Sequence, residues 1–186
     1  MTVKRLFFAA LMLLTLTACG KQRFDPAQVA ERYAAGAISA EYTVKTHAAF
    51  FTEYKLSSAV ENGISQVTIL EPKSVAGISA RLEGEQAVVQ YEDVALDALL
   101  PEKTGYAPVD VLHVLLEDLK TALPESWGIE NDALVLEYIT VFTDNTRGLK
   151  RVFLNPETLD LQGAELYLED SLILSVQMTQ FSCTAG

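Results

Sequence analysis

The chain has 186 residues and a mass of 20.4 kDa, with 49% apolar and 21% charged residues, so it has room for one domain with its own core and is not a disordered polypeptide. Fourteen basic and 25 acidic side chains give a net charge of −11. This charge excludes nucleic acid as a partner, because binding phosphates needs a basic face. It also argues against binding through anionic lipid headgroups. Two Cys and two His are too few for a structural zinc site, and we predict neither a metal nor a cofactor.

Residues 1–18 have the pattern of a bacterial signal peptide. A Lys-Arg pair at positions 4 and 5 precedes an apolar stretch over residues 6–17, which is too short to span a bilayer as a helix because spanning takes about 20 residues. The stretch ends in Leu16-Thr17-Ala18-Cys19, which resembles the bacterial lipobox. The resemblance implies a diacylglycerol group on the Cys19 sulfur and cleavage just before it. The alternative is an ordinary secretory signal in which a cysteine happens to follow a small residue.

A lipid on Cys19 would make the membrane a partner of this protein. Several acyl chains give a lasting anchor where a single chain binds only marginally. Residues 19–23 would then be a lipidated tether, and the mature chain would carry a net charge of −13 because residues 1–18 hold two basic side chains and no acidic one. We expect the body to lie on the extracytoplasmic face of the plasma membrane, or at the outer membrane of a Gram-negative host. Cys183 would be left without a disulfide partner.

The mature chain opens with a helix signal and continues as a strand pattern. Asp25 suits the cap and Pro26 the first helical position, and Gly36 suits the end, so we predict a helix of about ten residues. Apolar and polar residues then alternate over 38–54, which predicts one long antiparallel strand with a covered face and a bulge or bend. Asn62-Gly63 predicts a tight hairpin.

The remaining patterns predict an antiparallel meander interrupted by one helix. Leucines at helical spacing between Pro108 and Pro124 predict that mid-chain helix. The predicted strands cover 64–70, 74–82, 86–91, 133–142, 149–154, 159–168 and 172–181. About four strands before the helix and about four after it, joined by short turns, predict an α+β fold rather than a parallel α/β sheet.

The residues that carry chemistry do not form a catalytic pattern. His47 falls on the polar face of the long strand and His113 on the solvent side of the helix, so we interpret both as surface side chains. The adjacent carboxylates Glu92-Asp93, Glu117-Asp118 and Glu169-Asp170 point apart and do not make a catalytic dyad. No nucleophile elbow, phosphate-binding glycine loop or zinc-protease motif is present. We predict that the protein is not an enzyme; the alternative is an envelope hydrolase whose site the fold assembles.

Trp127 is the single tryptophan and falls just past the predicted helix. A tryptophan in such a place either anchors a partner or packs the helix onto the sheet. We favour packing.

These features together resemble the bacterial lipoprotein-carrier (LolA/LolB-like) superfamily. They are the lipobox, the first helix, the long meander with its helical insertion, and a turn at Asn155-Pro156-Glu157-Thr158-Leu159. Val67-Thr68-Ile69-Leu70-Glu71-Pro72, followed by Gly77-Ile78-Ser79-Ala80, is similar to the early sheet of the Gram-positive germination-lipoprotein (GerS-like) relatives, which we expect to be nearest. The resemblance implies that residues 24–186 form one half-barrel domain, a strongly curved antiparallel β-sheet with the helices on its concave side.

The resemblance implies a binding function of one of two kinds. In the carrier the cavity shelters acyl chains, whereas the germination lipoprotein is thought to act through a protein partner, a cortex-modifying amidase. We expect a membrane-anchored, non-catalytic adaptor for an envelope protein; the alternative is a receptor for acyl chains or another hydrophobic ligand. Eight side chains would either line a lipid-sized cavity or pack directly under the helices: Leu134, Leu136, Tyr138, Leu166, Leu168, Leu172, Leu174 and Val176.

Overall fold

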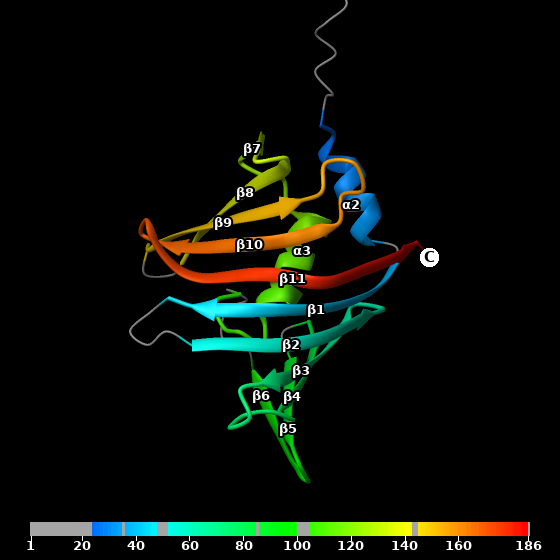
Figure 1. The fold of residues 1–186 in the computed structure, drawn as a ribbon, viewed down its shortest axis with the longest axis vertical. Coiled ribbons are helices and arrows are strands. Elements are labelled where there is room, and N and C mark those ends of the chain that lie inside the picture. Colours follow the sequence, from blue (N-terminus) through cyan, green and yellow to red (C-terminus); the bar gives the residue numbers. More distant parts are fainter. Residues whose placement is uncertain are drawn as a thin grey trace, which may run out of the picture.

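The fold is one curved, unclosed antiparallel sheet with two helices on its concave side (Figure 1). The structure, a computed structural model, describes residues 24–34, 36–47, 52–84, 86–99, 105–142 and 145–185. Within them the eleven strands are ordered β6-β5-β4-β3-β2-β1-β11-β10-β9-β8-β7, so the first and last strands are neighbours at the middle and β6 and β7 are the two edges. The predicted α+β half-barrel is confirmed.

Six strands precede the second helix and five follow it. The first six are β1 (Gly36–Thr46), β2 (Thr52–Glu61), β3 (Ile64–Glu71), β4 (Ser79–Glu83), β5 (Gln86–Tyr91) and β6 (Val94–Leu99). The last five are β7 (Ser126–Glu130), β8 (Ala133–Val141), β9 (Arg147–Leu154), β10 (Leu161–Leu168) and β11 (Ser171–Ala185). Both edge strands, β6 and β7, were missing from the sequence prediction, because each is short and lies half in solvent, where an apolar pattern is weak.

The first helix, α2 (Pro26–Ala34), begins as predicted. The Asp25 carboxylate accepts the backbone N–H of Ala27 at 3.0 Å and caps the helix. Gly36 then starts β1 where the chain lies against β11: a side-chain carbon there would stand 2.0 Å from the carbonyl oxygen of Thr184, so the close strand pairing requires glycine.

The long alternating segment is a hairpin and not the single bent strand that the pattern predicts. β1 ends at Thr46 and β2 begins at Thr52, and these two residues face each other across the pair. An odd number of residues, 47–51, connects them, so the alternation of faces continues unbroken from one strand into the next. Those residues, His-Ala-Ala-Phe-Phe, include no glycine, proline or asparagine to mark a turn. The expected irregularity occurs within β1, as a register shift against β11 between Glu41 and Tyr42.

Two other predicted chain turns can be compared with the structure. Asn62 and Gly63 join β2 to β3 with φ of 52° and 78°, which confirms the tight hairpin. The segment predicted as a strand over 74–82 is a strand only from Ser79; the preceding residues form turns that include Gly77 with φ of 88°.

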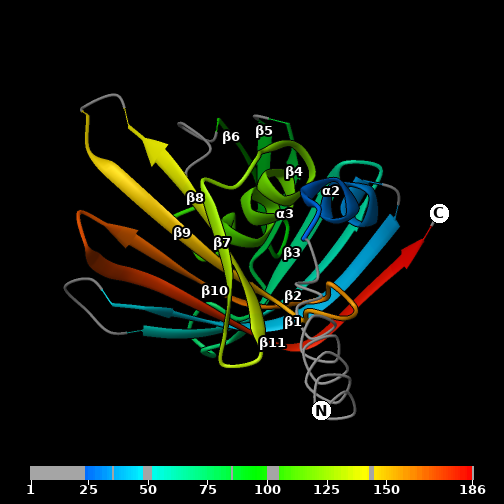
Figure 2. The ribbon, with the colours of Figure 1, turned by 90° about the horizontal axis from the view of Figure 1, so that it is seen from above.

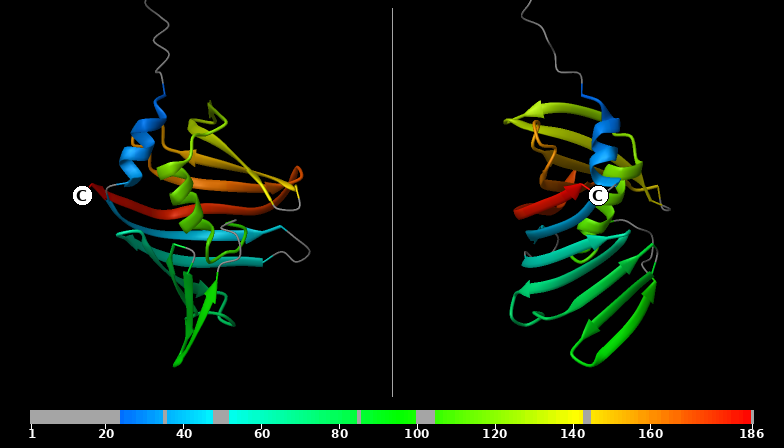
Figure 3. Two further views of the ribbon diagram at one scale, coloured as in Figure 1. Left: turned by 180° about the vertical axis from the view of Figure 1, so that it is seen from behind. Right: turned by 90° about the vertical axis from the view of Figure 1, so that its right-hand side faces the viewer.

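The concave side holds both helices (Figures 2 and 3), and their buried side chains are part of the hydrophobic core. The second helix, α3 (Val111–Thr121), lies within the predicted segment and crosses the inside of the sheet. Its buried leucines join inward-facing residues from both halves of the sheet, such as Tyr42, Leu56 and Leu154, in one hydrophobic cluster. Among the described residues no helix is long and apolar enough to cross a membrane.

Candidate functional site

Six of the eight residues predicted on the concave side are buried there: Leu134, Leu136, Tyr138, Leu166, Leu174 and Val176. The strand register places part of this set in one row, in which Val176 pairs with Ala164, Ala164 with Val152, and Val152 with Leu136. The six belong to the same hydrophobic cluster as the leucines of α3. The other two, Leu168 and Leu172, are half-buried near the β10–β11 turn, where the register shifts next to Leu166.

A buried ion pair ties α3 to the sheet at this face. Lys150 lies in the inward row between Leu166 and Tyr138, and its side chain is 3% exposed. Its ammonium group donates to a carboxylate oxygen of Asp118 on α3 at 2.7 Å. An unpaired ammonium would be costly at this depth, so the pair fixes the position of α3 over β8–β10. Lys150 could not be identified from the sequence, because the alternation of a strand does not by itself say which of its two faces is covered.

His113 is buried, and its predicted position on the solvent side of the helix is wrong. Its imidazole is 3% exposed, and Nδ1 lies 2.7 Å from the hydroxyl oxygen of Ser65 on β3. The prediction assumed a helix with one covered face, whereas the sheet wraps around α3 so that Val111 through Leu116 are all buried. His47 is exposed, as predicted, with Nε2 3.0 Å from the hydroxyl oxygen of Ser175.

The two histidines therefore contact different partners. The part of the chain that the structure describes contains no group of three or more His, Cys, Asp or Glu side chains that would hold a metal ion.

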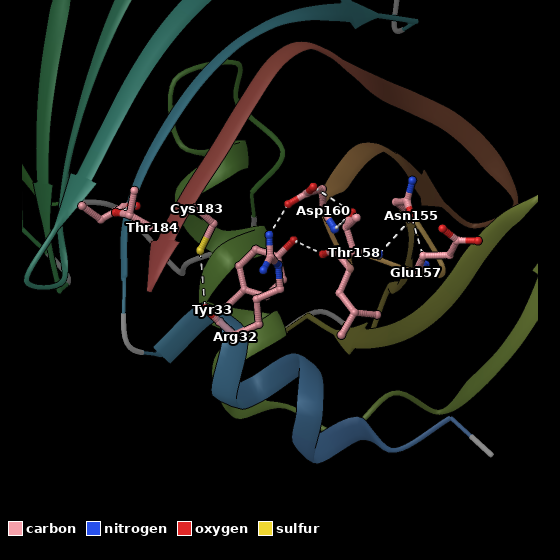
Figure 4. Close-up of polar contacts among 10 residues, drawn as sticks. Arg32, Tyr33, Asn155, Glu157, Thr158, Asp160, Cys183 and Thr184 are labelled. Carbon is pink, nitrogen blue, oxygen red and sulfur yellow. Dashed lines mark hydrogen bonds and ion pairs between the residues drawn. The ribbon is translucent and has the colours of Figure 1, made fainter. Parts of the chain in front are cut away.

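A second polar cluster fastens α2 to the β9–β10 turn and the end of β11 (Figure 4). The Arg32 guanidinium pairs with the Asp160 carboxylate, and the Tyr33 hydroxyl donates to the carbonyl of Leu159 at 2.8 Å. The thiol of Cys183 donates to the carbonyl of Arg32 at 3.4 Å, and burial raises the pKa of this thiol. A raised pKa keeps a thiol protonated and a poor nucleophile, so the cluster holds the helix in place and offers no reactive cysteine.

The turn that contributed to the family resemblance has a local cause. The Asn155 side-chain oxygen accepts the backbone N–H groups of Glu157 at 2.9 Å and Thr158 at 3.0 Å (Figure 4). Such a side-chain bond closes the turn between β9 and β10. It also presents Leu159 and Asp160 to α2.

The convex face has a groove of about 490 Å³ across β1, β11, β10 and β9, with Arg151 in its wall. The Arg151 guanidinium lies 2.7 Å from Glu130, 3.1 Å from Glu137 and 3.6 Å from Glu165. Three carboxylates around one guanidinium make this cluster a brace between β7, β8, β9 and β10. A hydrogen bond from the Ser126 hydroxyl, with Arg151 adding to it, lowers the pKa of Glu137.

The concave face continues past the helices at both edges of the sheet, and apolar side chains are exposed there. At one edge Leu96 pairs with Val89 and Val89 with the buried Ala80, so Leu96 shares the concave side of the sheet. We call the exposed residues at this edge the β6 patch: Tyr91, Val94 and Leu96.

At the opposite edge Trp127 pairs with Leu136, and Ile129 pairs with Leu134. Both partners are buried on the concave side, whereas Trp127 is 48% and Ile129 60% exposed. Leu123, between α3 and β7, is 82% exposed. We call Leu123, Trp127 and Ile129 the β7 patch.

Trp127 does not pack α3 onto the sheet as predicted. It lies on the edge strand β7, and its ring is centred 5.0 Å from that of Phe24, the residue before the cap of α2. The sheet reaches one strand further than the sequence indicated, which carries the tryptophan out to the edge. Cys19, the signal peptide over 1–18 and the tether over 19–23 lie outside the described residues.

Comparison with known proteins bears on the fold. No protein-family model matches the sequence, and no curated protein does either. Among solved structures, the chain is similar to an uncharacterized conserved protein from Thermus thermophilus, with 7% identity, 87% of this chain and 86% of the other covered, and a TM-score of 0.54.

Two further similar structures are a LolA superfamily protein and a lipoprotein-sorting protein domain. A LolA superfamily protein from Nitrosomonas europaea has 11% identity, 88% and 96% coverage of the two chains, and a TM-score of 0.45. A putative outer membrane lipoprotein-sorting protein domain from Vibrio parahaemolyticus has 13% identity, 87% and 92% coverage, and a TM-score of 0.45. Identities this low compare folds alone.

Proposed function

We propose that this protein is a lipid-anchored, extracytoplasmic and non-catalytic binding protein that engages an envelope protein through the β6 patch. One observation carries the proposal: the middle of the concave face is filled by α3, whereas Tyr91, Val94 and Leu96 remain exposed at its edge. Clustered exposed apolar side chains beside a polar surface are typical of protein-binding sites.

The burial on the concave side favours a protein partner over an acyl chain. An acyl chain needs apolar space, and the six buried inward residues from Leu134 to Val176 belong to the same hydrophobic cluster as the leucines of α3. Moving α3 aside would separate Lys150 from Asp118 and leave an ammonium group buried without its partner. We therefore interpret the six buried residues of the predicted set as core of the binding protein rather than lining of a lipid site.

The lipobox supports anchoring, and the adaptor role is what the sequence resemblance to the germination lipoproteins implies. None of the similar structures described above is a germination lipoprotein, so that nearest relationship stays a prediction. A protein held at Cys19 cannot shuttle between membranes, so the role is that of a fixed receptor or adaptor. With a net charge of −13 after processing, the body favours a partner with a basic or apolar surface over an acidic one.

A site-specific crosslinking experiment tests the proposal. The full chain would carry a photo-crosslinking residue at Leu96, be expressed in its bacterial host and be irradiated in intact cells. The matched control carries the same residue at Gln177, which is exposed on β11 away from the β6 patch. We expect a single envelope protein to be crosslinked from Leu96 and not from Gln177, and to be lost when Val94→Asp is added. Crosslinking only to lipid, or lipid co-purifying with the protein, would favour the acyl-chain alternative.

A further inference from the structure

The β7 patch lies where the tether joins the body. The rings of Phe24 and Trp127 contact each other in a tilted arrangement with their centroids 5.0 Å apart, and α2 starts at the same end of the molecule as β7 (Figure 1). Only the four residues 20–23 separate the anchoring cysteine, Cys19, from Phe24. Because an extended chain spans at most about 3.3–3.6 Å per residue, this tether reaches about 17 Å. A lipid on Cys19 therefore keeps Trp127 close to the headgroups.

The side chains of the β7 patch suit the boundary between lipid and water. Leu123 and Ile129 are mostly exposed apolar residues, and Trp127 presents half of an amphipathic ring. Tryptophan is enriched at membrane interfaces, because its ring body prefers the acyl boundary and its N–H prefers the headgroups. The exposed Glu125 lies between Leu123 and Trp127 in the sequence, so the patch suits a zwitterionic surface rather than anionic lipid.

We propose that the β7 patch docks on the bilayer that holds the lipid anchor, with Trp127, Ile129 and Leu123 in the interfacial layer. This inference rests on the lipid anchoring in the proposed function and deepens it. A bound β7 edge fixes the orientation of the whole sheet, because β6 is the opposite edge of the same sheet (Figure 1). The β6 patch then points away from the membrane, toward proteins of the envelope.

A membrane is favoured over a second copy of the chain by the position of the tether. Any protein that covered Trp127 would have to fit within the short space that residues 19–23 leave between Phe24 and the lipid. The bilayer is already there, at a local concentration that the covalent anchor sets.

Fluorescence of Trp127 tests the inference directly, since it is the single tryptophan. The full-length lipidated protein would be reconstituted into phosphatidylcholine vesicles, with or without lipids brominated near the headgroup end of the acyl chains. We expect loss of Trp127 emission in the brominated vesicles and a blue shift relative to protein in which Cys19→Ser removes the anchor.

The matched control moves the tryptophan to the other edge of the sheet. In a Trp127→Phe, Tyr91→Trp double variant the single tryptophan occupies a position with nearly the same exposure, 47% against 48%. Circular dichroism would verify its fold, and we expect bromine not to quench it.

The outcomes separate the two proposals. Protein that floats with the vesicles but shows unquenched Trp127 would overturn the docking and leave the anchor intact. Unquenched Trp127 that is shielded from acrylamide would assign the patch to a second copy or another protein, and would also overturn it. Protein that fails to float with vesicles would overturn the lipid anchor, and the docking with it.

Discussion

Lys150 sets the position of α3 through a single buried contact. It is the one buried lysine or arginine among the described residues, and it faces Asp118 from within a row of apolar side chains. Hydrophobic burial is non-directional, so it favours a helix on the concave face without fixing its rotation or its place along the sheet. A paired charge is directional, because only one arrangement brings the ammonium group to the carboxylate.

Replacing Asp118 and replacing Lys150 should lower the free energy of unfolding by different amounts. Asp118→Ala leaves the Lys150 ammonium buried without compensation and should cost about 3 kcal/mol of unfolding free energy. Lys150→Met fills the same space with an apolar side chain and leaves a carboxylate that already reaches solvent, so it should cost about 1 kcal/mol or less. Urea denaturation of both variants measures the difference, and equal costs would contradict the assigned burial.

The stabilisation from the Ser126–Glu137 hydrogen bond should decrease as the pH falls. Because the Ser126 hydroxyl and then Arg151 lower the pKa of Glu137 in the folded state, the stability that this contact contributes is present at neutral pH. It is lost as the pH falls through that lowered pKa, where Glu137 becomes protonated. Ser126→Ala should therefore cost about 0.5 kcal/mol at neutral pH, the low end for a hydrogen bond between partly solvated groups. Denaturation midpoints of the two proteins should converge below the usual carboxylate range; a gap that persists there would disprove the sign.

At the level of the helices and strands, packing of α3 under the curved sheet is the feature on which the protein-binding interpretation depends. Leu112, Leu115, Leu116 and Leu119 of this helix are all buried. Polar contacts join this helix to strands from both halves of the sheet, to β3 through Ser65 and to β9 through Lys150. A tightly packed helix leaves little room for an acyl chain beside it.

Truncating a leucine on α3 should reveal how well it is packed. Leu115→Ala is expected to cost about 2–5 kcal/mol, the range for a leucine whose removal leaves a cavity. The control, Leu123→Ala, changes an exposed leucine just after the helix and should stay within about 0.5 kcal/mol. Thermal or urea unfolding compares the two, and similar small losses would indicate a loosely filled interior open to a ligand.

Some of the helices, strands and turns could be predicted from the sequence alone, and others could not. The helix over Pro26–Ala34, the Asn62-Gly63 hairpin and strand β5 were predictable, because caps, tight-turn residues and alternation are local signals. The hairpin between Thr46 and Thr52 was not, because its connection keeps the alternation in phase and carries no turn residue.

The candidate surfaces were harder to predict than the strands. Burial of His113 depends on a sheet that wraps a helix from several sides, and exposure of Trp127 depends on an extra edge strand, both of which arise only from tertiary structure. The sequence pattern does not reveal either patch, because an exposed apolar residue on an edge strand cannot be told from a buried core residue by its type or spacing.

For the whole molecule, the two ends of one concave face have different surroundings. The β7 edge lies beside the start of α2 and so beside the tether, whereas the β6 edge lies at the far end of the sheet (Figure 1). Under our two proposals, the β7 patch faces the lipid surface and the β6 patch faces a protein partner. All of this depends on a lipid at Cys19.

Metabolic labelling of growing cells with an alkyne fatty acid tests that claim most directly. We expect the wild-type protein to take up the label and Cys19→Ser to abolish the labelling. The control Cys183→Ser, which removes the other cysteine of the chain, should keep it. An unlabelled wild-type protein, or label that persists in Cys19→Ser, would contradict the account.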